Sequence, residues 1–404
     1  MDKSNTESSS VAVRDRIGVD RFEVLLDDKQ NIYYCGKIVT GKVYIVLNST
    51  TEITSIKVIC KGEGHVKFTN RSAGFKRKFS SQEVYLHEEI ELLDTEAKIQ
   101  SDDFSFNIQL PDKLPSSFEG RYGRVRYSIC ASLNTTNENI KLYSDTLSFT
   151  VAPIFDLNNH PLAPLPISEN IAKTFMGHAE PLTVSIFLPV RGYVPGQTIP
   201  LKVNFENSSN IDVKKLRVVL KKVVLYRSME SVRKHKEIVV EIEQPIDKNN
   251  CVYNEEFDLP AIPPSGTVCN LIDVEYKLKV EAFADINEWY YKMFYKNLKI
   301  RMDIIIGTVP LKNYEEPVDS NEDLKNVEKV TSDDQVDENQ LAPCKYMIQF
   351  VSNYWLISRL KYQRSRIYRS SKPDQDETDD EKDKETQEFS PMYRVYEFKN
   401  NLNV

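Results

Sequence analysis

Glycine is scarce in this chain, at 13 of 404 residues, and the patterns that usually mark a catalytic or nucleotide-binding loop are missing. The sequence has no G-x-x-x-x-G-K-[ST], no G-x-G-x-x-G and no G-x-S-x-G, so it lacks the loops that hold phosphates or present a nucleophilic serine. The five histidines are scattered, without a spacing that suits a metal ion. We therefore expect neither enzymatic activity nor a cofactor.

Long apolar runs are missing as well. No window approaches the ~18 consecutive apolar residues of a membrane span, and the polar start MDKSNTESSSVAVRDR has no apolar core of the kind a signal peptide needs. The six cysteines are far apart, without a C-x-x-C pair, which favours reduced thiols in a cytoplasmic protein. The net charge of −7 argues against a general affinity for nucleic acid.

What the chain does contain is a divergent internal duplication. The stretch YYCGKIVTGKVYIVLNSTTEI (33–53) parallels YVPGQTIPLKVNFENSSNI (193–211), with Gly36 on Gly196. Further along, FNIQLPDKLPSSFEGRYGRVRYSICASL (106–133) parallels FDLPAIPPSGTVCNLIDVEYKLKVEAF (257–283). Two matches in the same order indicate two copies of one domain.

Within each copy, apolar and polar residues alternate in short runs rich in β-branched and aromatic residues. This period of two predicts an all-β protein with two tandem, immunoglobulin-like antiparallel β-sandwiches. We expect a flexible N-terminus at 1–20, a first sandwich at 21–152, a proline-rich linker at 153–178 and a second sandwich at 179–311. The remaining 312–404 should form a largely flexible tail with acidic, basic-amphipathic and acidic segments.

Five segments resemble a known family. LPSSFEGRYGRVRYSI, FDLN, LPVRGYVPGQTIPLKVNFENSS and IIIGTVPL occur in order before residue 312, and FSPMYRVYEF follows near the end. Together they resemble the alpha-arrestins, or arrestin domain-containing proteins. The resemblance implies two arrestin-type sandwiches without catalysis. It also implies an adaptor in the cytoplasm, peripherally associated with the plasma membrane and endosomes, that binds cytosolic segments of membrane proteins and controls their endocytosis, sorting or ubiquitination.

The resemblance further implies recruitment of HECT-type ubiquitin ligases through a Pro-Pro-x-Tyr motif in the tail. The matching place here reads Ala342-Pro343-Cys344-Lys345-Tyr346, in which a cysteine replaces the second proline. A WW domain stacks its aromatic rings on stiff prolines and inserts the tyrosine into a second pocket. Pro343 and Tyr346 therefore form a degenerate motif, and we expect weakened ligase recruitment.

Two basic runs are candidate binding loops, one in each domain. They read Phe75-Lys76-Arg77-Lys78 and Arg233-Lys234-His235-Lys236. Loops of this kind hold phosphate groups on a cargo protein or on phosphoinositide headgroups, although lysines at a hairpin tip are often simply solvated. The candidate residues are Lys76, Arg77, Lys78, Arg233, Lys234 and Lys236.

The tail segment 344–372 carries seven basic residues and no acid. Apolar residues from Met347 to Leu360 recur at helical spacing, which predicts a basic amphipathic helix suited to an anionic membrane surface. The alternatives are packing on the second sandwich and disorder. The acidic segment 371–388 that follows would shield the helix by charge. The expected membrane contacts are Met347, Phe350, Trp355, Arg359, Lys361, Arg364, Arg366 and Arg369.

Two other functions are compatible with the sequence. One is a constitutive scaffold subunit of an endosomal coat. The other is a redox-linked regulator that forms a disulfide with a thioredoxin-like protein, for which Cys251 and Cys269 lie in the second domain.

Overall fold

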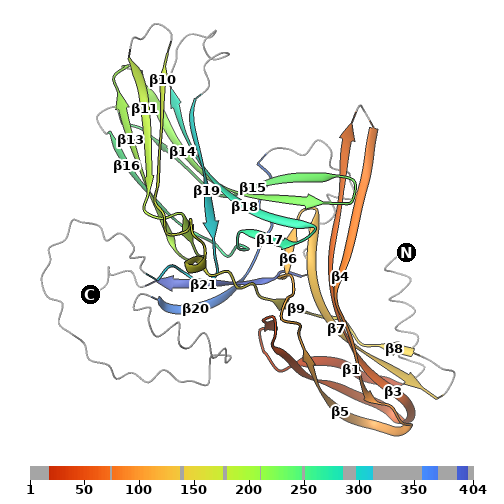
Figure 1. The fold of residues 1–404 in the computed structure, drawn as a ribbon. Helices are drawn as coiled ribbons and strands as arrows, with labels where there is room; N and C mark the ends of the chain where they lie inside the picture. The colour runs from red at the N-terminus through yellow and green to blue at the C-terminus, as the bar shows by residue number, and fades with distance from the viewer. Residues whose placement is uncertain are drawn as a thin grey trace, which may run out of the picture.

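The structure, a computed structural model, describes residues 18–72, 75–136, 141–175, 180–209, 211–247, 251–284, 297–312, 357–371 and 389–398. These residues form β-strands, turns and one short 3-10 helix, with no α-helix among them. Two elongated β-sandwiches meet at one end each (Figure 1). The predicted all-β, two-sandwich fold is confirmed.

The first sandwich is organised around one very long strand, β3. Its beginning pairs with β1 and β5, and its second half pairs with β7 and β4, so β3 takes part in both layers. The strands of this domain are β1 (Val19–Leu26), β2 (Ile32–Tyr33), β3 (Ile38–Ser72), β4 (Phe75–Leu93), β5 (Ala97–Gln109), β6 (Phe118–Gly120), β7 (Gly123–Thr135), β8 (Lys141–Tyr143) and β9 (Leu147–Val151).

The second sandwich consists of a four-stranded sheet, ordered β10-β11-β13-β16, and a six-stranded sheet, ordered β12-β19-β18-β14-β15 with β17 beside β18. Its strands are β10 (Ile167–Thr174), β11 (Pro181–Leu188), β12 (Gly192–Tyr193), β13 (Thr198–Asn207), β14 (Val213–Arg227), β15 (Val232–Pro245), β16 (Val252–Asp258), β17 (Gly266–Cys269), β18 (Ile272–Ala284) and β19 (Leu298–Ile306).

The duplication seen in the sequence is visible in the backbone. In both domains a two-residue strand pairs in parallel with the last strand, β2 with β9 and β12 with β19, within otherwise antiparallel sheets. Gly36 and Gly196 occupy equivalent turns with φ of 71° and 88°, a region that favours glycine. Tyr127 and Tyr276 each donate a hydroxyl hydrogen bond back to a proline carbonyl, at 2.6 and 2.7 Å.

The linker is shorter than predicted. Residues 167–174 form β10, an edge strand that pairs with β11 along its length. Before it, the 3-10 helix η1 (Leu157–Asn159) lies against the end of the second domain, where the Leu157 amide donates to the Val309 carbonyl at 3.2 Å. The exposed polar residues of β10 resemble a linker in the sequence, because an edge strand on the surface needs few apolar side chains.

The tail also contributes to the fold. Strands β20 (Ile357–Arg364) and β21 (Met392–Phe398) form an antiparallel hairpin, and residues 365–371 continue along the edge of β15. The predicted amphipathic helix is therefore wrong for residues 357–364. Met347, Phe350 and Trp355, like Pro343 and Tyr346, lie outside the described residues.

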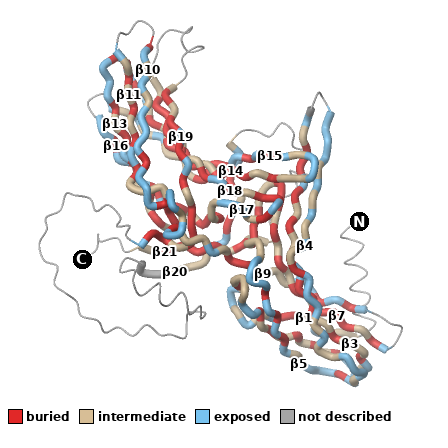
Figure 2. Tube along the Cα trace, in the orientation of Figure 1, coloured by how far each residue is buried: buried red, intermediate tan, exposed pale blue. Residues whose placement is uncertain are grey.

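The buried apolar side chains form one main cluster that runs through both domains. It contains core residues of the first sandwich, such as Phe118 and Tyr122, and of the second, such as Tyr226 and Tyr276. Buried segments continue across the junction in Figure 2. The two sandwiches are thus packed together, and the linker is not the only connection between them.

Candidate functional site

The β3–β4 hairpin extends from the first domain alongside the second. Its two strands pair up to Ser72 opposite Phe75, with register shifts at Ile56/Lys57 and Gly62/Glu63. The predicted loop residues 76–78 consequently belong to strand β4 and lie just after the tip of the hairpin. Lys76, Arg77 and Lys78 are all exposed there.

The second predicted loop is also a strand. Residues 233–236 lie in β15, directly after the turn that joins it to β14. Because side chains alternate along a strand, Arg233 and His235 point inward and are buried, whereas Lys234 and Lys236 point outward and are exposed. Only half of this basic run is available to a ligand.

The structure brings these two hairpins together, although the contacting residues Asn70 and Ser231 are 161 residues apart in sequence. Asn70 donates to the Ser231 hydroxyl at 2.8 Å, and Arg77 lies 3.6 Å from the Glu230 carboxylate. The Met229 amide donates to the Ser81 hydroxyl at 3.3 Å. The turn between β14 and β15 therefore packs against the β3–β4 hairpin from Asn70 and Arg77 down to Ser81.

Arg233 has a structural role at this contact and is 9% exposed. Its guanidinium donates to the Thr69 carbonyl and, at 3.0 Å, to the Asn70 side-chain oxygen of the first domain. The guanidinium also stacks on the Tyr122 ring at 4.5 Å. The candidate role of Arg233 in phosphate binding is corrected accordingly, because this side chain is engaged between the domains.

His235 completes the domain contact. Its ring packs edge to face on Tyr122 with centroids 5.2 Å apart. Burial lowers the pKa of His235 to about 4, so the imidazole is neutral at pH 7.

Among the described residues, the two most exposed large apolar side chains lie on these two hairpins, Met229 at 99% and Phe75 at 76% exposed. Val232, which follows the β14–β15 turn, is 54% exposed. Lys76 and Arg77 are exposed beside Phe75, and Glu230 beside Met229 lies 3.6 Å from Arg77. We call residues 75–78 and 229–232 the hairpin crest.

The cations of the hairpin crest are recognisable in the sequence as a basic run, whereas the exposure of Phe75 and Met229 on adjoining hairpins is not. A large apolar residue inside a turn, as in Ser228-Met229-Glu230-Ser231, is a usable signal because burial cannot explain it there. That the hairpins carrying these two residues adjoin could not be read from the sequence, since it depends on how the domains pack.

The tail hairpin lies between the two sandwiches. The Tyr396 amide donates to the Pro195 carbonyl at 3.0 Å, and the Tyr396 hydroxyl donates to the Thr308 carbonyl at 2.6 Å, both in the second domain. The Tyr393 hydroxyl donates to the Ser117 carbonyl of the first domain at 3.1 Å.

A buried cation joins the same contact from the tail. Arg394 is 4% exposed and donates to the Tyr34 hydroxyl of the first domain at 2.6 Å. The Tyr34 hydroxyl also hydrogen-bonds to the Tyr362 hydroxyl of β20. β20 and β21 thus bridge the domains through both backbone and side chains.

Residues 365–371 dock on the free edge of β15. The Ile238 amide donates to the Arg369 carbonyl at 3.0 Å, and the Tyr368 amide donates to the Glu237 carboxylate at 2.9 Å. Glu237 itself forms a fully buried ion pair with Lys222 at 2.8 Å. This part of the tail therefore packs on the second sandwich, which is one of the two alternatives to a membrane-bound helix.

Several cations proposed to contact a membrane have partners within the chain. Lys361 pairs with Glu397, Arg369 pairs with Glu241, and Arg366 stacks on the Tyr368 ring at 4.8 Å. Arg364 is exposed, and the side chain of Arg359 is not described.

Other candidate chemistry is sparse. Cys251 is exposed, whereas Cys269 is buried and burial raises the pKa of its thiol, which disfavours disulfide exchange there. Among the described residues there is no cluster of three or more potential metal ligands. That part of the chain also has no helix long and apolar enough to cross a bilayer.

Comparison with known proteins agrees with this architecture. The family description "Arrestin (or S-antigen), N-terminal domain" matches residues 22–158, and "Arrestin (or S-antigen), C-terminal domain" matches residues 178–311.

Individual relatives carry the same family name. The chain is 26% identical to arrestin domain-containing protein 17 of Caenorhabditis elegans, over 73% of this chain and 72% of the relative. It is 27% identical to arrestin domain-containing protein 1 of Rattus norvegicus, over 66% and 62%, and 23% identical to arrestin domain-containing protein 4 of Mus musculus, over 72% and 72%. This chain belongs to the alpha-arrestin family of arrestin domain-containing proteins.

Proposed function

We propose that this protein is a non-catalytic adaptor that binds cytosolic segments of membrane proteins through the hairpin crest. Its family consists generally of non-enzymatic adaptors. The observation that carries the proposal is the exposure of Phe75 and Met229 on adjoining hairpins of two domains. Large apolar side chains this exposed, with a basic rim, are typical of a protein interaction surface.

The charge of the hairpin crest favours partners near a membrane. Lys76, Arg77 and Lys78 face solvent close to Phe75, and Glu230 offsets one of these three charges through its ion pair with Arg77. Cytosolic membrane surfaces are negatively charged and attract such residues, which places the apolar tips close to the cargo segment. The adaptor acts in the cytoplasm at the plasma membrane and endosomes, where it controls endocytosis, sorting or ubiquitination of its cargo.

The motif that would recruit a ubiquitin ligase is incomplete in this chain. Pro343 and Tyr346 retain only part of a Pro-Pro-x-Tyr motif. We propose that a HECT-type ligase, where it takes part, binds this degenerate motif weakly or reaches the cargo through another adaptor.

The test is a rescue experiment with a surface readout. Cells that lack the protein are complemented with the wild-type chain or with the Phe75→Ser, Met229→Ser double variant, and surface biotinylation measures which membrane proteins change in abundance. The wild type should restore the changes and the double variant should not.

The matched control is Val84→Ser, which removes an apolar side chain that is 65% exposed on the same strand, β4, but away from the tip. It should rescue like the wild type. Equal rescue by the double variant and the control would show that the hairpin crest does not bind cargo.

A further inference from the structure

A serine-proline dipeptide stands where the chain enters strand β21. Ser390-Pro391 is the one place in the 404-residue sequence where a serine or threonine precedes a proline, although the chain has 19 prolines. This dipeptide is the minimal pattern that proline-directed serine/threonine kinases recognise. Ser390 is half-buried at the rim of the tail hairpin. A kinase of this class would therefore find a single target in the whole chain.

The hydroxyl of Ser390 takes part in the backbone pairing of the hairpin. The pairing of β20 with β21 continues past Arg364, and the Ser365 amide donates to the Pro391 carbonyl at 2.9 Å. In an antiparallel pair of this kind the opposite residue donates in return, but proline has no amide hydrogen. The Ser390 hydroxyl supplies the missing donor, at 2.5 Å from the Ser365 carbonyl oxygen.

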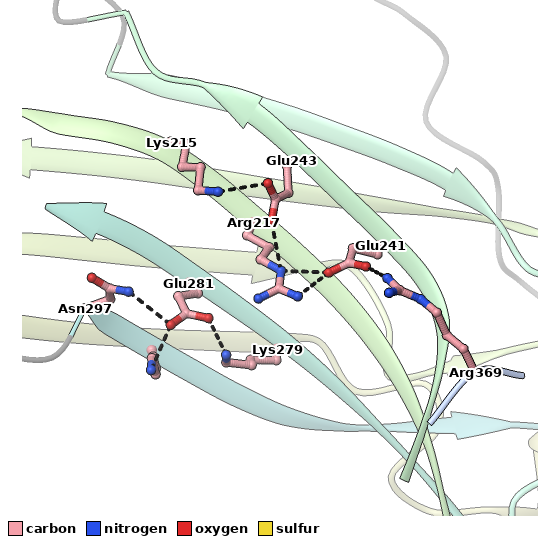
Figure 3. A network of polar contacts seen from close by, with 9 residues as sticks. Lys215, Arg217, Glu241, Glu243, Lys279, Glu281, Asn297 and Arg369 are labelled. Carbon is pink, nitrogen blue, oxygen red and sulfur yellow. Dashed lines mark hydrogen bonds and ion pairs between the residues drawn. The ribbon is translucent and has the colours of Figure 1, made fainter. Parts of the chain in front are cut away.

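This hydrogen bond lies at a buried branch point of the tail. Ser365 is 8% exposed, so water does not readily replace a lost donor there. Directly after Ser365 the chain leaves β20 and runs to the edge of β15, where Arg369 pairs with Glu241. Figure 3 shows Glu241 held between Arg369 and Arg217. The Ser390 hydroxyl thus supports both β21 and the segment that docks on β15.

Contacts with the first domain come at the start of β21, next to Ser390. The Met392 amide donates to the Thr150 hydroxyl at 3.3 Å, and the Tyr393 hydroxyl donates to the Ser117 carbonyl at 3.1 Å. The contacts of Tyr396 with the second domain follow later along the strand. A disturbance at Ser390 would therefore act first on the attachment of the tail to the first domain.

We propose that Ser390 is the phosphorylation site of a proline-directed protein kinase, and that the phosphate releases the start of β21 from the first domain. The kinase transfers the γ-phosphoryl group of ATP. A bond forms between the serine Oγ and the phosphorus, the bond from that phosphorus to ADP breaks, and the hydroxyl proton passes to the catalytic base of the kinase. This inference does not depend on the function proposed for the hairpin crest.

Phosphorylation removes the donor and adds repulsion at the same place. The ester oxygen has no hydrogen, so the buried Ser365 carbonyl loses its partner and faces a group with a charge of about −1.5 to −2. Arg364 and Arg366 flank Ser365, but both are exposed, and Arg366 already stacks on Tyr368. An exposed ion pair is screened by solvent, whereas a buried carbonyl without a donor bears its full desolvation cost. Release therefore outweighs the new attraction.

The experiment incubates the full-length protein with ATP and a purified proline-directed kinase of the mitogen-activated class. Mass spectrometry of the intact protein should show one added phosphate, and none in Ser390→Ala. Hydrogen exchange then compares the phosphorylated and untreated proteins. Amides of residues 392–398 should exchange at least about tenfold faster after phosphorylation. The same protein with phosphoserine incorporated at position 390 during translation should show the same acceleration without a kinase.

Two substitutions separate the hydroxyl from the phosphate. Ser390→Thr keeps a hydroxyl donor, so without kinase it should exchange at the wild-type rate. Ser390→Ala loses the donor but gains no charge, so it should accelerate exchange less than the phosphate does, and kinase treatment should change it no further. Exchange in the central strand β18, residues 272–284, should stay within about twofold of the untreated wild type in every sample, which distinguishes local release from unfolding.

Several results would overturn the proposal. The site is wrong if the kinase adds no phosphate to the wild type or modifies Ser390→Ala equally. The effect is wrong if the phosphate leaves exchange at residues 392–398 unchanged, or slows it, as capture of the phosphate by Arg364 or Arg366 would do. The hairpin crest variant with Phe75→Ser and Met229→Ser should respond to the kinase like the wild type, so a failure of the function proposed for the hairpin crest leaves this test intact.

Discussion

Arg233 is a charged residue that is buried and holds the two domains together. In the sequence it is one member of a basic run, but the alternation of side chains along β15 points it toward the first domain. There its guanidinium donates to the Thr69 carbonyl and stacks on the Tyr122 ring. A buried guanidinium needs such partners, because an unpaired buried charge is strongly unfavourable. Its neighbour Lys234 faces solvent and has no comparable role.

His235 leads to a prediction about pH. Its pKa falls from 6.5 to about 4 on folding, so the unfolded state binds more protons between these values, and stability is lost as the pH falls through this window. We expect His235→Gln to remove about 2 kcal/mol of the stability difference between pH 7 and pH 5. Urea denaturation at the two pH values measures this.

Lys234→Gln is the control, since Lys234 is the exposed neighbour of His235 on β15 and lysines do not ordinarily change charge between pH 5 and pH 7. The control should show the same difference between pH 7 and pH 5 as the wild type. An unchanged pH dependence in His235→Gln would contradict the neutral, buried state of this ring.

At the scale of elements, the tail motif F-x-P-x-Y-x-x-Y-x-F has a structural explanation. Its two tyrosines lie on β21, where Tyr393 reaches the first domain and Tyr396 reaches the second. Gly196 makes the close approach possible, because a Cβ at this position would lie 2.0 Å from the Tyr396 carbonyl oxygen. β21 can therefore pack on this turn only if residue 196 has no side chain.

We predict that Gly196→Ala releases β21. The added methyl group clashes with the backbone of the strand, so amide exchange at residues 392–398 should accelerate by about tenfold or more. Hydrogen exchange with mass spectrometry measures this.

Gly266→Ala provides a matched control. Gly266 also has a positive φ, of 111°, so alanine is strained there too, but nothing lies within 4 Å of the added atom. Exchange at β21 should stay at the wild-type rate in this variant, and an equal acceleration in both variants would assign the effect to backbone strain alone.

The tail shows where element prediction from the sequence fails. Apolar residues up to Leu360 match the spacing of a helix, yet 357–364 pairs with a strand about 30 residues further along. A single segment cannot reveal such a partner, because the strand that supplies its backbone hydrogen bonds lies elsewhere in the chain. The same reason hides β10, whose polar edge resembles a linker.

At the scale of the whole molecule, the two sandwiches share one buried cluster. Tyr122 packs edge to face on Tyr226 across the junction, at 5.6 Å between centroids. The tail hairpin adds a second bridge through Arg394 and Tyr34. Opening the junction would expose aromatic rings and leave buried polar groups without partners.

We therefore predict that both domains unfold in one cooperative transition in scanning calorimetry. Arg233→Gln should lower the free energy of unfolding by about 2 kcal/mol, because it removes charged hydrogen bonds between the domains. Lys234→Gln, one residue away and exposed, should change the free energy of unfolding by less than about 0.5 kcal/mol. Two separate transitions in the wild type would contradict a shared core.

The sequence by itself determined the architecture of each domain, because strand periodicity and turn glycines such as Gly36 and Gly196 act locally and recur in both copies. It also determined the family, through short segments that stay in order. Only the tertiary structure decided which of the basic residues face solvent, and that the hairpins carrying Phe75 and Met229 adjoin. Those features depend on register and domain packing, which are set by contacts between residues far apart in the chain.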